Sequence, residues 1–274
     1  MPAASHASDA GYGATMTVSA PLRVGVFGAT GRMGTTACAA IAADPELELV
    51  AAVARSRAGG TIAGIAVADD RAAMLAADVE VAVDLTVLDA ARANVAWCAE
   101  QGLHAVVGTT GFTDDDVAAL RSAFTRSSCL IAPNFAIGAV LMMRFAELAA
   151  PFFETAEVIE LHHDAKADAP SGTAMMTARR MAAASPDWAP DPTRHEVVEG
   201  ARGGAGPAGI HVHSVRLRGL VAHQEVLLGT TGQTLTIRHD SYDRASFMPG
   251  LLLGIKRVAE RPGVTLGLDA LLGV

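Results

Sequence analysis

The stretch LRVGVFGATGRMG at residues 22–34 decides the fold of this chain. An apolar, β-branched run ends at Phe27, and three glycines, Gly28, Gly31 and Gly34, follow before an alanine-rich segment. A strand, a glycine-rich turn and a helix N-terminus together place backbone N–H groups where a pyrophosphate binds, which predicts a dinucleotide-binding unit. The spacing is Gly-x-x-Gly-x-x-Gly and departs from the commonest fingerprint, so a tight strand-to-helix turn that merely needs glycine is the alternative.

Short apolar runs continue to alternate with helical stretches as far as residue 134. The expected strands are Leu22–Phe27, Leu47–Val53, Val79–Leu85, Leu103–Val107 and Cys129–Ala132, and the expected helices begin near Arg32, Ala90 and Asp114. This alternation predicts right-handed βαβ units and a parallel sheet. The fold class is therefore α/β, with a Rossmann-like dinucleotide-binding domain assigned to residues 21–134 and 241–274.

The pattern changes after Pro133. We expect helices over Ile137–Ala150 and Gly172–Ala184, a strand over Ala156–Leu161, a long loop over Ser185–Gly209, and a last helix over Phe247–Glu260. Three further runs, His211–Leu217, His223–Leu228 and Thr234–His239, have short connections, which predicts an antiparallel meander. Residues 135–240 are assigned to an α+β domain for substrate binding and oligomerisation, with an open mixed sheet. Residues 1–20, rich in Ala, Ser and Gly, are expected to form a disordered tail.

The composition excludes several classes of function. The chain has 274 residues, 51% of them hydrophobic and 18% charged, and a net charge of −8, which argues against binding to nucleic acid or to an anionic membrane. Its three cysteines form no Cys-x-x-Cys pair, so we expect neither a disulfide framework nor a metal site. No basic leader and no long apolar run is present, and a cytoplasmic location is expected.

The end of the second expected strand bears on the choice of cofactor. Dinucleotide folds that bind NAD place an acidic residue there to hold the ribose, whereas an arginine accommodates a 2′-phosphate. This chain has Ala54 at that point, followed by Arg55, Ser56 and Arg57. The pattern predicts that NADPH is preferred, with NADH possible as a second cofactor. The alternative is that both arginines are solvated surface charges.

The densest chemistry lies in the stretch ELHHDAKADAPSGTA at residues 160–174. A strand ends in two histidines, a lysine follows, and Ser171 is placed to cap a helix that begins with Gly172 and Thr173. Free N–H groups at that helix start, with the lysine ammonium, suit a carboxylate, and a histidine beside them can transfer a proton near neutral pH. A His-His pair alone would more often be structural or a chance pair of metal ligands.

The stretch at residues 160–174 resembles the signature of the 4-hydroxy-tetrahydrodipicolinate reductase (dihydrodipicolinate reductase) family, in its actinobacterial form. The resemblance extends in the family's order to Val26–Gly34, Val107–Phe112, Ala132–Ala136, Gly219–Glu225 and Asp240–Phe247, and so covers nearly the whole chain from Leu22 onward. It implies NAD(P)H-dependent reduction of 4-hydroxy-tetrahydrodipicolinate to tetrahydrodipicolinate in diaminopimelate and lysine biosynthesis, by a homotetramer. The partners implied are a small dicarboxylate substrate and the chain itself.

The resemblance also implies roles for single residues. It makes His162 the proton-transferring group, supported by Lys166. The residues implied for the substrate carboxylates are His163, Gly172, Thr173 and Arg244. The residues expected to bind the cofactor, from the glycine turn and from the resemblance together, are Gly28, Thr30, Gly31, Arg32, Met33, Gly34, Arg55, Gly108, Thr109, Thr110, Pro133, Asn134 and Phe135.

Some features depart from the family pattern or leave other functions open. Leu85 stands where the family usually has Phe, and the usual Pro near Leu88 is missing, which affects only the packing around the nicotinamide. Another NAD(P)-dependent dehydrogenase of small acids is an alternative, although it leaves the 160–174 stretch unexplained. A cofactor-sensing protein that has lost catalysis is another, against which the intact His162, Lys166 and Arg244 argue.

Overall fold

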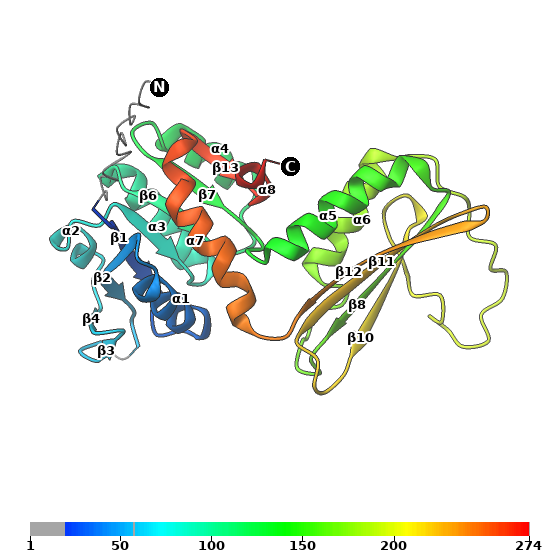
Figure 1. Ribbon diagram of the computed structural model, residues 1–274, viewed down its shortest axis with the longest axis horizontal. Coiled ribbons are helices and arrows are strands. Elements are labelled where there is room, and N and C mark those ends of the chain that lie inside the picture. Colours follow the sequence, from blue (N-terminus) through cyan, green and yellow to red (C-terminus); the bar gives the residue numbers. More distant parts are fainter. Residues whose placement is uncertain (1–19, 57, 274) are drawn as a thin grey trace, which may run out of the picture.

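The chain forms two lobes, each built around one β-sheet (Figure 1). The computed structural model describes residues 20–56 and 58–273. The expected disordered tail lies outside the described residues except for Ala20, and the expected domain bounds remain a prediction. No helix of the described part is long and apolar enough to cross a bilayer.

The first sheet has eight strands in the order β13-β7-β6-β5-β1-β2-β4-β3. Their bounds are β1 (Leu22–Phe27), β2 (Leu47–Val53), β3 (Thr61–Ile62), β4 (Ile65–Ala68), β5 (Val81–Asp84), β6 (His104–Val107), β7 (Ser128–Ile131) and β13 (Gly263–Leu266). Neighbouring strands run parallel, except for the antiparallel pair of β3 and β4. This confirms the predicted α/β class with a parallel, Rossmann-like sheet.

Helices cover both faces of this sheet. They are α1 (Arg32–Ala43), α2 (Ala72–Ala76), α3 (Leu88–Gln101), α4 (Asp114–Ala123), α7 (Met248–Arg257) and α8 (Asp269–Leu272), with the 3₁₀ turns η3 (Arg244–Phe247) and η4 (Val258–Glu260) beside α7. Ile41 of α1 and Ile255 of α7 belong to one buried cluster, whereas Val95 of α3 and Leu120 of α4 belong to another. The strand order reverses between β1 and β5, and ligands of such sheets bind at the carboxyl ends of the strands at that point.

The three cysteines carry free, buried thiols in the first lobe, Cys38 on α1, Cys98 on α3 and Cys129 on β7. Burial raises the pKa of Cys38 to about 11 and that of Cys98 to about 12, and it also raises the pKa of Cys129. The folded chain is therefore expected to react only slowly with an aromatic disulfide reagent at about pH 8, because the thiolate is the reactive form. All three thiols should react quickly once guanidinium unfolds the chain. Fast labelling of the folded protein would contradict this expectation.

The second sheet has the order β12-β11-β8-β10-β9, and it is mixed, as predicted. Its strands are β8 (Thr155–His162), β9 (Gly204–Ala205), β10 (His211–Arg216), β11 (Ala222–Thr230) and β12 (Gln233–Ser241). Helices α5 (Ile137–Ala149) and α6 (Gly172–Ala184) cover one face (Figure 1). The 3₁₀ turn η1 (Ala150–Phe152) follows α5, and η2 (Pro207–Gly209) lies between β9 and β10. Val158 and Val226 pack against Ala146 and Met181 of these helices in a third buried cluster.

The predicted antiparallel meander is wrong for its first strand. β11 and β12 do pair antiparallel, but β10 pairs parallel with β8, and β8 separates it from β11. The chain from β8 to β10 passes through α6 and therefore forms a crossover, which returns it parallel to β8. The short link from β10 to β11 only has to cross the end of β8, about 10 Å, which a few residues can span. Chain proximity alone thus suggested the wrong strand pair.

Candidate active site

The glycine turn after β1 has no room for side chains at two of its positions. Gly28 has a φ of +75°, and a Cβ there would lie 2.9 Å from the carbonyl oxygen of Leu85. A Cβ on Gly34 would overlap the carbonyl oxygen of Gly28. The turn is closed by the Gly31 N–H, which donates to the Gly28 carbonyl at 2.9 Å. A bare backbone at the N-terminus of α1 fits a pyrophosphate, so the residues present suit a dinucleotide.

A cavity of about 700 Å³ opens beside this turn. Four residues predicted to bind the cofactor line it together: Gly28, Thr30, Gly31 and Arg55. The Thr30 and Ser56 hydroxyl oxygens in its lining lie 3.0 Å apart, and Asp69, Asp70 and Arg71 also line it. Arg32, Met33 and Gly34 form the first turn of α1 instead, where Arg32 is exposed and Met33 packs against the core. Arg57 lies outside the described residues.

A buried carboxylate that the sequence analysis did not single out joins the loops after β5 and β6. Asp84 accepts hydrogen bonds from the Thr86 N–H at 3.0 Å, the Thr86 hydroxyl at 2.7 Å, the Asn94 amide at 2.8 Å and the Thr109 hydroxyl at 3.2 Å. Because these donors come from three segments at the carboxyl edge of the sheet, Asp84 fixes the floor of the expected nicotinamide site. The sequence feature that could have identified Asp84 is its position at the end of a buried strand.

The other residues predicted for the cofactor lie apart from the large cavity. Thr109, Thr110 and Pro133 line a cavity of about 340 Å³, which Arg180 of α6 also borders. Phe135 is a core residue whose ring would lie 3.1 Å from a Cβ on Gly108. Leu85, which departs from the family pattern, also lies close to this glycine: its Cδ2 would be 2.8 Å from a Cβ on Gly108. Asn134 lines a third, smaller cavity, so the structure divides the predicted cofactor residues among three cavities, the first turn of α1 and the core around Phe135.

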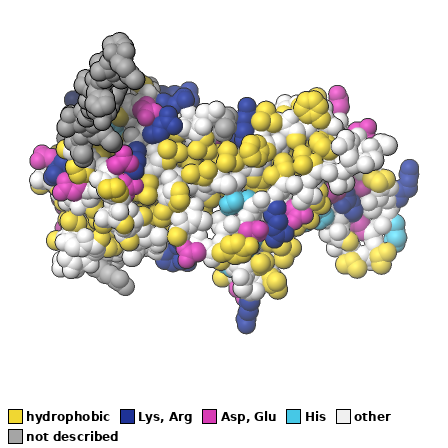
Figure 2. Space-filling view, in the orientation of Figure 1, with side chains coloured by type: hydrophobic (Ala, Val, Ile, Leu, Met, Phe, Trp, Pro, Cys, Tyr) yellow, Lys and Arg dark blue, Asp and Glu magenta, His cyan; other side chains and the backbone are white. Residues whose placement is uncertain are grey.

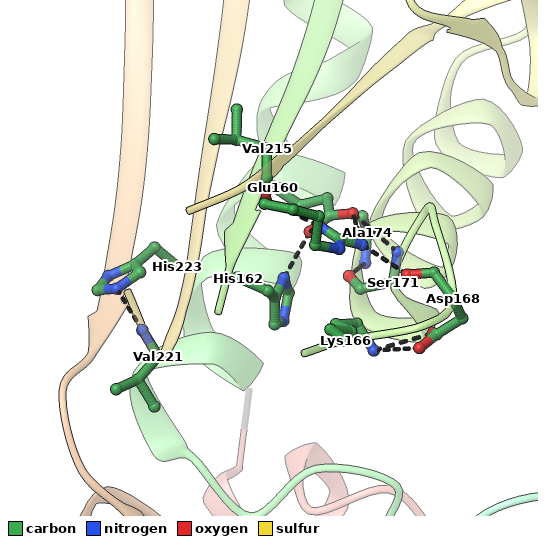
Figure 3. Close-up of polar contacts among 10 residues, drawn as sticks. Glu160, His162, Lys166, Asp168, Ser171, Ala174, Val215, Val221 and His223 are labelled. Atoms are coloured by element: carbon green, nitrogen blue, oxygen red, sulfur yellow. Dashed lines mark hydrogen bonds and ion pairs between the residues drawn. The ribbon is translucent and has the colours of Figure 1, made fainter. Parts of the chain in front are cut away.

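His162 lies at the end of β8 and is held by a carboxylate from its own strand (Figure 3). Its Nδ1 is 2.5 Å from Oε2 of Glu160, which is completely buried. The Arg216 guanidinium of β10 donates to both oxygens of Glu160, at 2.9 Å and 2.8 Å. Neither Glu160 nor Arg216 was predicted as a site residue. Period-two alternation could have placed Glu160 beside His162, but Arg216 arrives only through the parallel pairing of β10 with β8.

Burial and charge pull the pKa values of this pair in opposite directions. Burial lowers the pKa of His162, and the hydrogen bond to Glu160 only partly offsets that effect. Burial alone would raise the pKa of Glu160, but the hydrogen bonds from Arg216 and His162 outweigh it and hold the pKa below its usual value. Glu160 is therefore ionised near neutral pH.

Lys166 is anchored by a neighbouring carboxylate rather than by His162. Its Nζ lies 2.7 Å and 2.9 Å from the two carboxylate oxygens of Asp168, and this hydrogen bond lowers the pKa of Asp168 (Figure 3). The Asp168 carbonyl accepts from Arg216 at 2.6 Å, so the loop that carries Lys166 is connected to Glu160. A substrate carboxylate that binds Lys166 would share the ammonium with Asp168.

Helix α6 begins at Gly172, so the N–H groups expected to bind a carboxylate lie at a helix N-terminus. Ser171 caps this helix, since its Oγ accepts from the Ala174 N–H at 3.2 Å, as the sequence predicted. A cavity of about 40 Å³ lies beside the cap, and His162, Ser171, Thr173 and Asn134 line it. The Asn134 amide donates to the Thr173 hydroxyl at 3.4 Å and thus links the two lobes.

The remaining predicted substrate residues do not line this small cavity. His163 is exposed, and its N–H donates to the Val221 carbonyl at 3.4 Å. Gly172 is exposed and has open space around its Cα. Arg244 lies in η3 with its side chain exposed, and no other residue of ranges 20–56 and 58–273 pairs with it. The described residues contain no group of three His, Cys, Asp or Glu side chains that could hold a metal ion.

A Rossmann-type sheet with a glycine turn, joined to a mixed sheet that ends in a His-Glu-Arg cluster around a buried carboxylate, is typical of an oxidoreductase with a nucleotide-binding domain. Family models described as "Dihydrodipicolinate reductase, N-terminus" and "Dihydrodipicolinate reductase, C-terminus" match residues 22–135 and 138–272. The chain belongs to the dihydrodipicolinate reductase family.

Individual relatives agree with this assignment. The 4-hydroxy-tetrahydrodipicolinate reductase of Cutibacterium acnes is 52% identical over 92% of this chain and 99% of its own. That of Nocardia farcinica is 53% identical over 92% and 98%. A dipicolinate-bound dihydrodipicolinate reductase from Paenisporosarcina sp. TG-14 superposes with a TM-score of 0.84 at 38% identity, covering 91% of this chain and 99% of that one. These findings confirm the resemblance and the oxidoreductase class predicted from the sequence.

Proposed function

We propose that this chain reduces 4-hydroxy-tetrahydrodipicolinate, or the dihydrodipicolinate formed from it, to tetrahydrodipicolinate in diaminopimelate and lysine biosynthesis. The observation that carries the proposal is the site itself: His162, bound to a buried carboxylate, lies beside the N-terminus of α6 in a chain that also has a dinucleotide turn. The relative that binds dipicolinate supports a ring with two carboxylates as the substrate class.

The reaction removes water from the hydroxylated substrate and adds one hydride and one proton to the ring. A bound nicotinamide would supply the hydride. The chain itself has to hold the two carboxylates, exclude water and deliver the proton. The Gly172 and Thr173 N–H groups with Lys166 suit one carboxylate, and His163 with Arg244 suits the other. Hydride addition would leave an enamine, and His162 protonates its carbon.

Arg244 requires a movement of the two lobes for this role. It is exposed, and it does not line the small cavity beside His162. Closure about the links near Asn134 and Asp240 would bring η3 toward the start of α6, and such closure also removes water from a site.

The direct test is turnover. Purified chain, NADPH and freshly generated 4-hydroxy-tetrahydrodipicolinate should give a steady loss of nicotinamide absorbance. A dehydrogenase of another small acid would instead respond to 2-oxo acids with ammonia, and a cofactor-sensing protein would bind NADPH without turnover. Either of those results would overturn the proposal.

For the cofactor, we propose that NADPH is preferred over NADH. Arg55 and Ser56 line the large cavity at the end of β2, where Ala54 stands in place of the acidic residue that would bind the ribose, although Asp69 and Asp70 border the same cavity after β4. Replacing Arg55 by Ala should lower kcat/KM for NADPH about 10-fold and leave the value for NADH nearly unchanged, because a charge-assisted bond contributes about 1.5 kcal/mol. The measurement is kcat/KM with both cofactors for both proteins. A clear preference of the unaltered chain for NADH would contradict the proposal.

We further propose a cytoplasmic homotetramer that assembles through the second sheet. Helices cover only one face of that sheet, and Ile159, Leu161, Val215 and Leu227 alternate toward the other. Apolar side chains also gather over α5 and α6 (Figure 2). Phe145 of α5 is 48% exposed, and Phe152 of the turn η1, which follows α5, is 77% exposed. Two apolar surfaces suit an assembly with more than one kind of contact. Sedimentation of the full chain should give four copies, and a monomer at micromolar concentration would contradict this.

A further inference from the structure

Each carboxylate oxygen of Glu160 has two hydrogen-bond partners, although the side chain is completely buried. Oε1 accepts from Arg216 at 2.8 Å and from the Ser171 N–H at 3.2 Å. Oε2 accepts from Arg216 at 2.9 Å and contacts Nδ1 of His162 at 2.5 Å. A buried carboxylate with this set of partners is stable in its charged form because a bidentate guanidinium compensates it.

The charged form of Glu160 dictates which nitrogen of His162 carries the fixed proton. An ionised carboxylate can only accept, so the 2.5 Å contact requires a hydrogen on Nδ1. Nε2 is then the ring atom that gains and loses the mobile proton. The same carboxylate also receives the Ser171 N–H and thereby fixes the residue that caps α6.

We propose that Glu160 is a positioning residue, which holds His162 as the Nδ1–H tautomer with Nε2 as the proton-delivering atom and sets the start of α6 against it. The proposal rests on the proposed function, since it gives the atom through which His162 acts. Arg216 takes part by keeping Glu160 ionised, and it ties the Lys166 loop to the same centre through the Asp168 carbonyl.

The pH dependence of the reaction reports on this arrangement. A proton donor is active in its protonated form, so the rate falls as the pH rises through the pKa of His162. Glu160 raises that pKa, whereas burial, Lys166 and Arg216 lower it. The histidines that border the same cavity from β11 and β12 are His223, bound to Asp240, and His239. Removing only the Glu160 charge should therefore shift the falling limb of the profile to lower pH.

Glu160→Gln is the informative change because it keeps the shape of the side chain. An amide that keeps its oxygen toward Ser171 turns its NH₂ toward Nδ1, so Nδ1 becomes the acceptor and the ring proton moves to Nε2. We expect kcat to fall by about 100-fold or more, since general acid catalysis is worth about 10²–10⁴-fold. Glu160→Asp, which keeps the charge, should recover part of the rate and the position of the limb.

The chain offers a matched control on the same strand. Glu157 of β8 also accepts from an arginine and a histidine, Arg202 at 2.7 Å and His213 at 2.7 Å, but it does not line the cavity beside His162. Glu157→Gln thus removes the charge of a partly exposed carboxylate that has the same kinds of partner on the same strand. It should leave the falling limb of the pH profile in place. It should also keep kcat within about 2-fold of the unaltered chain, which is small beside the roughly 10²–10⁴-fold contribution of general acid catalysis.

The experiment combines the pH profile with ¹⁵N NMR of the histidine rings in the full chain. We expect an Nδ1–H neutral tautomer for His162 in the unaltered protein, and both an Nε2–H tautomer and a limb at lower pH in Glu160→Gln. An Nε2–H tautomer in the unaltered protein would overturn the proposal, even if the variant failed to fold. A lower kcat in Glu160→Gln with the falling limb of the pH profile at its original position would also overturn the proposal. Failure of the proposed function is distinguishable, because the unaltered chain would then show no turnover at any pH.

Discussion

Replacing His162 by Gln and Lys166 by Ala in one chain is expected to lower kcat by about 1,000-fold or more. The change removes the proposed proton donor and the cation proposed to hold a substrate carboxylate. Dissociation of NADPH should stay within about 2-fold of the unaltered chain, because neither side chain lines the large cavity beside the glycine turn. Steady-state turnover and the fluorescence change on cofactor binding measure the two effects separately.

A histidine that lines none of the cavities described above serves as the control for this pair. His195 is exposed in the loop between α6 and β9, and His195→Gln should leave kcat unchanged. Retention of full turnover by the double variant would refute the roles given to His162 and Lys166. A large loss of NADPH binding would also count against them, since it would show that the change had disturbed the first lobe.

Replacing Gly34 by Ala is expected to weaken NADPH binding by about 100-fold, which corresponds to about 2.7 kcal/mol. The added Cβ would overlap the Gly28 carbonyl, so the turn has to move out of the position that lets backbone approach a pyrophosphate. Calorimetric titration with NADPH measures the affinity, and thermal unfolding shows whether the fold survives.

Thr36→Ala provides the matched control on the same helix. Thr36 is half-buried, and its hydroxyl bonds only to the Arg32 carbonyl one turn earlier. This variant should bind NADPH like the unaltered chain. If Gly34→Ala bound NADPH equally well while remaining folded, the turn would not be the pyrophosphate site.

The first lobe could be predicted well because its signals are local. The run that ends at Phe27, the glycines after it and the period of the apolar residues each point to a βα unit, and the parallel sheet follows from their repetition. The elements that were missed, such as β3, β4, α2 and α8, have only two to five residues each. So few residues cannot establish a hydrophobic period.

The second lobe shows where sequence reasoning fails. His162 and Lys166 could be recognised from one continuous stretch, and Ser171 could be predicted as a helix cap. Arg216 could not be connected with them, because its place depends on the parallel register that sets it opposite His162. Register between strands far apart in the chain is a property of the folded sheet, and the short link to β11 favoured a different pairing.

The central claim is that the chain transfers hydride from a nicotinamide to the dihydrodipicolinate ring. The most direct test uses NADPH carrying deuterium at carbon 4 of the nicotinamide, with 4-hydroxy-tetrahydrodipicolinate as substrate, and analyses the product by mass spectrometry and NMR. We expect one deuterium on a ring carbon of tetrahydrodipicolinate, with the label from only one face of the cofactor. Absence of that product, or tetrahydrodipicolinate free of deuterium from cofactor labelled on either face, would contradict the claim.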